Sequence, residues 1–452
     1  MEKTTKSDLA LETKSASAES ASAAKAEDES SEEAEKSFET KVSEALSAKN
    51  KSLTHSLIVG ASAEDLAAVA TNSKMMTTLM STLKKGELNA CLDALYVHVN
   101  DIDVLSACIK KRFGVNMGAK SIRGKIFLML VGKSEVPWTV SGAVHVYRSL
   151  ALLPPSHVAK MSAITTSNTE NGGGGVAIGW TGSFNVDYTE GDTDKISGWG
   201  YSDSKDDAKF DLNMFDTTIV HELAHIVDSG QKYSKRADFR AISDWVDEGK
   251  NASKIVDRVE ELAETPYHDD LTSEEKVIAK KGAERLIEKK VVKKDGIEPV
   301  VADVFKNLKK NADGTAKEKN RLGQLWDKIT SKPTDGHRSL EELTAVFEKS
   351  KVYTHLIRSM GNSSPLPCYG RLQAGMARQI HQGYEGRNWY SYANEAYEKK
   401  ITMYQFRDPG EEFAELYATY HCAAPKGDKL TPAHKGWFEK VGLHMDEPGK
   451  KK

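Results

Sequence analysis

The stretch "DTTIVHELAHIVDSG", residues 216 to 230, places two histidines and a glutamate in an otherwise apolar run. His221, Glu222 and His225 stand in the order H-E-x-x-H. On a helix this spacing puts both imidazoles on one face, about one turn apart, as a shared metal ion requires. The aliphatic flanks make the helix apolar nearly all round, which predicts that it is buried. Buried histidine and glutamate side chains need partners, and a zinc ion bound by His221 and His225 would supply them.

A catalytic zinc ion usually has three protein ligands and one water, so this site needs a third ligand. The pattern H-E-x-x-H-x-x-G-x-x-H would place that ligand at position 231, but this residue is Gln231. The other common solution is a glutamate on a later helix. Three places in the chain offer one: Glu248, the run "EELAE" that contains Glu260 and Glu261, and Glu411 in "DPGEEFAELYATYH".

Physical grounds favour Glu411 among these candidates. Asp408 and Pro409 form a strong helix start, because Asp caps a helix and Pro suits its first position. Glu411 and Glu415 then share a helix face with small residues, which would let this helix approach the zinc helix closely. Two carboxylates on a closely packed face are costly unless they meet cations, and zinc and a zinc-bound histidine are suitable ones. The alternative is a capping box between Asp408 and Glu411.

Two blocks of the sequence, "HELAHIVD" and "YQFRDPGEEFAELYATYH", resemble the catalytic domain of anthrax lethal-factor-like metalloproteases, a branch of the gluzincins. The resemblance implies a zincin-like fold, a Zn2+ cofactor and Glu411 as the third ligand. In that family a tyrosine seven residues before the ligand glutamate assists catalysis, and this position is Tyr404 here. The family's H-E-x-x-H-x-x-D pattern matches Asp228. A weaker likeness surrounds "LLPPSHV", and the first 140 residues lie outside the resemblance.

These residues predict a zinc metalloendopeptidase acting on a protein or peptide. Glu222 would be the general base, and Tyr404 would donate to the tetrahedral oxyanion or protonate the leaving group. Asp228 or Glu415 would orient a zinc ligand by contacting it on the side away from the metal. The alternative for both residues is a helix-end or surface charge. The alternative function is a helical scaffold or binding protein with a vestigial or structural metal site. The intact Glu222 disfavours it, because a structural site needs no base.

The chain changes character along its length. The beginning is rich in Ser, Ala and Glu and poor in large apolar residues, so we expect disorder there. The long gap before the third ligand predicts an inserted segment, which costs little because loop-closure entropy grows only logarithmically with length. The expected order is a disordered leader (1–55), a helical N-terminal domain (56–155), a zincin-like metallopeptidase domain (156–445) with a helical insertion at about 232–395, and a disordered tail (446–452).

The expected fold class is α+β, mostly helical, with a small mixed sheet beside the zinc-binding helices. Strands are predicted where β-branched and aromatic residues alternate with Gly and Asn, in "VAKMSAITTSN", "GVAIGWTGSFNVDYT" and "KISGWGYS". Such strands would offer an edge to an extended peptide. The run "IFLMLVG" from Ile126 predicts a buried strand or a short helix, and no run is long enough for a membrane helix.

Composition limits the classes of protein to which this chain could belong. The 452 residues are enough for two or three domains, and a net charge of −3 argues against a general nucleic-acid binder. The 4 cysteines are scattered without a C-x-x-C pair, which favours reduced thiols. The start has no apolar h-region, so we expect no standard secretory signal and synthesis in the cytoplasm. A toxin or effector delivered by a specialised export system and a processing protease both agree with these features.

Overall fold

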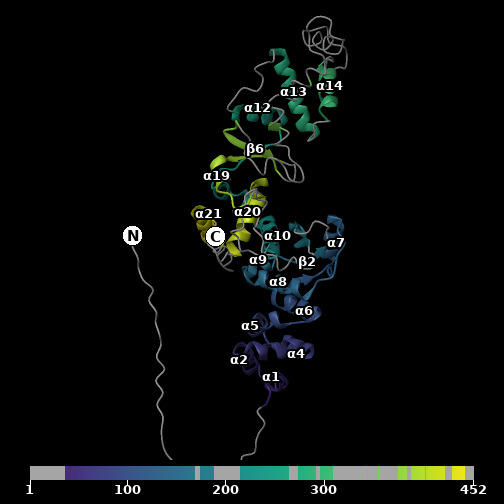
Figure 1. Ribbon diagram of the computed structural model, residues 1–452, viewed down its shortest axis with the longest axis vertical. Helices are drawn as coiled ribbons and strands as arrows, with labels where there is room; N and C mark the ends of the chain where they lie inside the picture. The colour runs from purple at the N-terminus through teal and green to yellow at the C-terminus, as the bar shows by residue number, and fades with distance from the viewer. Residues whose placement is uncertain are drawn as a thin grey trace, which may run out of the picture.

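The computed structural model describes residues 36–167, 174–187, 214–263, 273–291, 296–308, 344, 355–356, 375–383, 388–402, 404–422 and 430–442. These segments are mostly helical and carry two small sheets, which is the α+β class expected from the sequence. The short N-terminal helices lie at one end of the elongated molecule and the helices of the insertion at the other (Figure 1). No described helix is both long and apolar enough to cross a membrane.

The N-terminal part is a stack of short helices with well-formed ends. Asp101 caps one of them by accepting from the backbone amides of Asp103 and Val104, and Gly114 ends it with a φ of 80°. The thiols of Cys91 and Cys108 are buried in this stack, where burial raises the pKa of each to about 12. The helices are α1 (Phe38–Ser47), α2 (Lys51–Val59), α3 (Ala63–Thr71), α4 (Ser73–Thr82), α5 (Lys85–Leu95), η1 (Tyr96–His98), α6 (Ile102–Phe113), α7 (Ile122–Val131), α8 (Val140–Ala151) and α9 (Pro155–Val158).

Part of the expected disordered leader is helical. Ser37 caps α1 by accepting from the amide of Thr40, and Val42 and Leu46 are buried one turn apart. The expectation of disorder over residues 1–55 is therefore wrong from residue 38 onward. A buried pair at i and i+4 is enough to dock a short helix on a neighbouring core, even in a polar stretch. Residues 1–35 and the expected tail lie outside the described residues.

The first sheet has the strand order β1-β2-β4-β3, formed by β1 (Asn116–Met117), β2 (Ala163–Ser167), β4 (Ser183–Asp187) and β3 (Gly175–Ile178). Strand β2 pairs in parallel with β1 and β4, whereas β3 pairs antiparallel with β4 and lies at an edge of the described sheet. The run "IFLMLVG" lies in α7, so the helix alternative holds, but Met129 is 74% exposed rather than buried. The predicted strand "KISGWGYS" lies outside the described residues.

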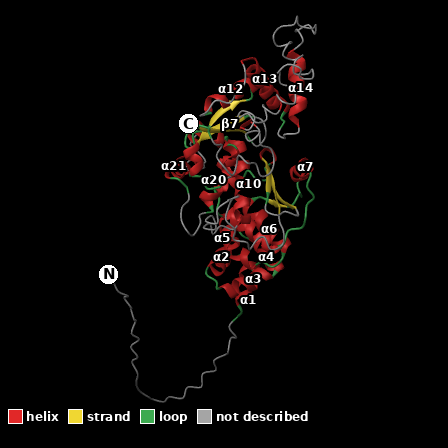
Figure 2. Ribbon diagram, turned by 45° about the horizontal axis from the view of Figure 1, so that its top comes forward, coloured by secondary structure: helices red, strands yellow, loops and turns green. Residues whose placement is uncertain are grey.

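The insertion has its own sheet and its own hydrophobic core. Its sheet has the antiparallel order β5-β7-β6, with β5 (Val246–Gly249), β7 (Trp389–Ala393) and β6 (Arg378–Gln382). The sheet lies beside α12 (Ala252–Leu262), which packs on α13 (Ser273–Lys289), and α13 packs in turn on α14 (Ile297–Leu308), as Figure 2 shows. The insertion is helical over α12, α13 and α14, as expected, and also carries this sheet. Tyr233 and Phe239 belong to the main core, so the separate core of the insertion begins after them.

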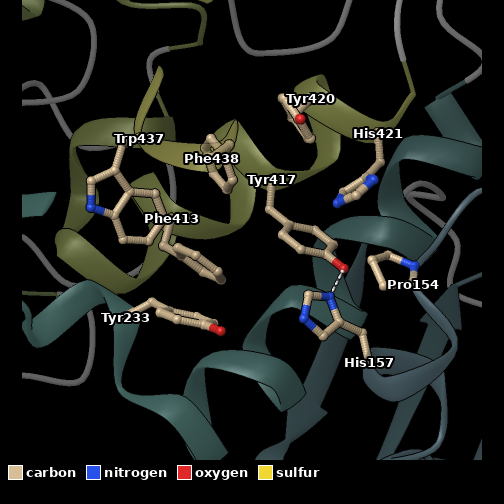
Figure 3. Close-up of a pocket in the computed structure, with 9 residues that line it drawn as sticks. All are labelled: Pro154, His157, Tyr233, Phe413, Tyr417, Tyr420, His421, Trp437 and Phe438. Atoms are coloured by element: carbon tan, nitrogen blue, oxygen red, sulfur yellow. Dashed lines mark hydrogen bonds between the residues drawn. The ribbon is translucent and has the colours of Figure 1, made fainter. Parts of the chain in front are cut away.

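Two long helices of the main core lie side by side, α10 (Met214–Gln231) and α20 (Pro409–His421). The far face of α20 packs on α21 (Pro432–Trp437) and η7 (Phe438–Gly442) through a group of aromatic rings (Figure 3). There Phe413 stacks on Tyr233, with 5.4 Å between ring centroids. The Tyr417 hydroxyl and His157 Nδ1 are hydrogen bonded at 2.6 Å. These contacts fix the rotation of α20 and so decide which of its residues face α10.

Candidate metal centre

The H-E-x-x-H residues lie in the middle of α10, where the apolar flanks bury the helix as expected. His221 and Glu222 are each 5% exposed, and the His225 side chain is 26% exposed. The two imidazoles lie one turn apart, and their Nε2 atoms are 3.1 Å from each other. The partial exposure of His225 means that this point reaches the surface of the protein.

Glu411 comes from the first turn of α20 and faces the same point. Its Oε2 atom lies 3.3 Å from Nε2 of His221 and 3.3 Å from Nε2 of His225. Asp408 caps α20 by accepting from the amides of Gly410 and Glu411, at 2.7 and 3.0 Å. The capping role therefore belongs to Asp408, and the Glu411 carboxylate is turned toward the histidines.

The three atoms fit a tetrahedral metal ion. Ligands at about 2.1 Å from a tetrahedral zinc ion lie about 3.4 Å apart, and the three separations here are 3.1, 3.3 and 3.3 Å. Glu411 Oε2 is buried and receives no well-formed hydrogen bond from the described residues, so its negative charge is directed at two imidazole nitrogens. His221, His225 and Glu411 form the one group of this kind within the described part of the chain.

The competing glutamates are engaged elsewhere. Glu248 pairs with Arg258 at 3.1 Å and accepts from the Ser391 hydroxyl at 2.6 Å, inside the insertion. Glu261 pairs with the same arginine at 2.7 Å. Glu260 lies on the same helix, α12, where burial raises the pKa of its carboxyl. The structure thus places Glu411, and none of these three, against the histidine pair.

The electrostatics of the cluster favour a positive charge between its members. Burial alone would raise the pKa of the Glu411 carboxyl, but the adjacent imidazoles of His225 and His221 lower it. Burial alone would lower the pKa of His221, but its contacts with Glu411 and Glu415 raise it well above the usual value. Either a proton or a metal cation on the imidazole nitrogens would balance the negative charge of the carboxylates, and the two compete for these nitrogens.

Glu222 points toward the edge of the first sheet. A Cβ built on Gly175 of β3 would lie 2.4 Å from Oε1 of Glu222, so only a glycine leaves room for this carboxylate. Burial raises the pKa of the Glu222 carboxyl, which the nearby His221 and His225 partly offset. The residue that the sequence predicts as a base is therefore confined between the histidines and β3, an outer strand of the sheet as described.

Glu415 and Asp228, the two residues expected to orient a zinc ligand, make different contacts in the structure. Glu415 Oε1 lies 2.9 Å from Nδ1 of His221, on the side of the ring away from the Nε2 atom that faces Glu411. Asp228 instead accepts from the amide and hydroxyl of Ser234, at 2.8 and 2.6 Å. The structure therefore gives Asp228 the helix-end role, closing the turn after α10, and corrects the expectation that it orients a ligand.

Tyr404 begins the short helix η6 (Tyr404–Arg407), immediately before α20. Its ring centroid lies 5.9 Å from that of His221, so the tyrosine borders the same point as the three candidate ligands. The guanidinium of Arg407 covers the ring at 4.4 Å. Tyr404 is partly exposed, whereas Gln405, Phe406 and Arg407 are buried.

Glu412 is fully buried beside the site, although its sequence position does not single it out as a functional residue. It accepts from the Ser243 hydroxyl at 2.5 Å, the Trp245 indole at 2.6 Å and the Gln405 amide at 3.0 Å. Burial raises the pKa of Glu412 to about 7, against the effect of these donors. The available signal was the density of apolar residues around it in "EEFAELYATY", which predicts a helix without a solvated face.

The assembled site therefore joins the imidazoles of His221 and His225, the carboxylates of Glu222, Glu411 and Glu415, and the phenol of Tyr404. These are groups that could act as ligands, as a base and as a hydrogen-bond donor around one partly accessible point. Comparisons with models of known families, with curated proteins and with solved structures find no match to this chain.

Proposed function

We propose that this protein is a zinc-dependent endopeptidase of the gluzincin type, with a zincin-like catalytic domain. The observation that carries the proposal is the convergence of His221, His225 and Glu411 with Glu222 beside them. Structural zinc sites are closed by four protein ligands, whereas catalytic sites have three and keep one position open. The described residues supply three, and His225 is reached from the surface.

Each side chain has a role that its position supports. Bound zinc would lower the pKa of a water toward neutrality and polarise the scissile carbonyl. Glu415 would hold the proton of His221 on Nδ1, which leaves the Nε2 lone pair for the metal. Glu222 would take the proton of the attacking water and pass it to the leaving amine. Tyr404 would donate a hydrogen bond to the tetrahedral oxyanion.

The edge of the first sheet supports an extended protein segment as the substrate class. Strand β3 lies at this edge, and its first residue, Gly175, contacts the Glu222 carboxylate. A peptide that pairs with β3 as a further strand would therefore run past Glu222. Trp180, two residues after β3 ends, is 66% exposed and would contact side chains of such a segment.

The test is to measure bound zinc and casein cleavage for wild type, Glu222→Gln and Glu411→Ala. We expect Glu222→Gln to keep zinc without activity, and Glu411→Ala to bind zinc poorly. Glu284→Gln is the matched control, because this carboxylate is buried and paired with Lys281 on α13, away from the cluster, and it should leave both quantities unchanged. Zinc binding without any hydrolysis would support the scaffold alternative, and equal activity in all variants would refute the assignment.

A further inference from the structure

The helix η6 carries Tyr404 but is fixed from the side of the insertion. Phe406 lies in an aromatic cluster with Trp245, Tyr392 and Tyr397. Its ring stacks on the Trp245 indole, with 5.7 Å between centroids and 22° between planes. Trp245 immediately precedes β5, so the insertion supplies the surface on which the residue two positions after Tyr404 is packed.

The backbone of η6 is held by the same sheet. His381 of β6 has its Nε2 atom 2.6 Å from the carbonyl oxygen of Arg407, and both residues are buried. Burial lowers the pKa of His381 to about 4, so the ring is neutral and its Nε2–H donates to that carbonyl. The last residue of η6 is therefore anchored to β6, an outer strand of the inserted sheet as described.

Glu412 connects this packing to α20. It joins Ser243 and Trp245, at the entrance to β5, with Gln405 of η6 through three hydrogen bonds of 2.5 to 3.0 Å. A fully buried carboxylate is tolerable only when its donors are present, since each lost donor leaves an uncompensated charge in a medium of low polarity. The three segments are thus fixed relative to one another by a single side chain.

A second branch of the network reaches the candidate ligands. The backbone N–H of Gln405 donates to the Thr402 hydroxyl at 3.1 Å, and that hydroxyl donates to Glu415 at 2.8 Å. Glu415 in turn contacts Nδ1 of His221 at 2.9 Å. Buried hydrogen bonds therefore run from the insertion, past the backbone next to Tyr404, to Glu415, whose carboxylate lies 2.9 Å from Nδ1 of the candidate ligand His221.

We propose that the inserted sheet β5-β7-β6 positions Tyr404 for catalysis, and that Glu412 is the positioning residue that joins the sheet to the helix of the third ligand. The inference rests on the proposed peptidase activity. It gives the insertion a role inside the active site, although the hydrogen bonds of Trp245 and Glu412 described above reach neither the Nε2 and Oε2 atoms of the candidate ligands nor the ring of Tyr404.

The experiment compares Trp245→Phe, which removes the indole donor and keeps an aromatic ring, with Ser243→Ala, which removes only a hydroxyl. Both should lower kcat for casein by about 10- to 100-fold, as expected for a misplaced catalytic group, while KM and zinc affinity change less than about twofold. In a Tyr404→Phe background the same changes should have little further effect on kcat. Amide hydrogen exchange at Gln405 and Phe406 should accelerate in both variants.

Tyr147→Phe is the matched control. Tyr147 is also buried, and this change likewise removes a donor to a carboxylate, through the 2.6 Å hydrogen bond to Asp93, while it keeps an aromatic ring on α8, away from η6. It should not change kcat or the exchange of η6. An unchanged kcat and exchange in both test variants would overturn the inference, as would an equal loss of kcat with and without the Tyr404 hydroxyl. If wild-type protein cleaves no casein, the proposed function fails, and the exchange rates alone decide whether the sheet holds η6.

Discussion

Replacing Gly175 with alanine should disable Glu222 while leaving the metal ligands in place. The added methyl carbon would lie 2.4, 2.5 and 2.6 Å from Oε1, Cγ and Cδ of Glu222. Ordinary contacts of a Cβ begin at about 3.4 Å, so the carboxylate has to retreat by about 1 Å. Gly175 needs no special backbone conformation, so the effect is steric and directed at this one side chain.

The size of the effect follows from that displacement. A misplacement of about 1 Å in a catalytic group costs about 100-fold in rate. The atoms that must move are the end of a side chain rather than backbone, so the loss of stability should stay near the lower end of the roughly 1–3 kcal/mol seen for overpacking. Zinc affinity should be unchanged, because His221, His225 and Glu411 are not touched by the new carbon.

The assay follows kcat for casein, zinc affinity by competition with a chelator, and the thermal midpoint. Gly86→Ala is the control, because a Cβ on Gly86 meets nothing within 4 Å and this residue lies in α5. That change should leave activity intact and raise stability by roughly 0.5–1 kcal/mol, since alanine favours a helix. Wild-type kcat in Gly175→Ala would refute the position or the role assigned to Glu222.

Three further outcomes follow from the contacts. Glu415→Ala should weaken zinc binding about 10- to 100-fold, measured by chelator competition, because His221 loses the group that fixes its proton. Asp216→Ala should cost about 1.5–3 kcal/mol in urea unfolding without changing the activity of folded protein, because Asp216 holds His145 and the start of α10. Burial lowers the pKa of His381 in the folded protein to about 4, so the unfolded chain binds this proton more readily. The free energy of unfolding should therefore fall as the pH drops from about 6.5 toward 4, by up to about 1.4 kcal/mol per pH unit. Urea unfolding at several pH values should show this fall, and His381→Gln should flatten it.

The sequence correctly predicts the local features of the site. The i, i+4 spacing of His221 and His225 depends only on helix geometry, and the Asp408 cap depends on four consecutive residues. The histidine spacing and the Asp408 cap could be predicted from sequence because the interactions that decide them lie within one helical turn. The expectation of disorder from residue 38 onward failed for a different reason. It was based on the polar composition of the segment, which outweighed the local i, i+4 pair of Val42 and Leu46.

Only the tertiary structure decides which carboxylate meets the histidines and what holds it there. Glu411 is 186 residues beyond His225, and the local patterns that favour it over Glu248 do not by themselves place it against the histidines. The packing of α20 between α10 and the aromatic rings of α21 selects it. The burial of Glu412 and the helix-end role of Asp228 are decided in the same way. Spacing along the chain fixes contacts within a turn, but contacts between segments far apart depend on how their surfaces pack.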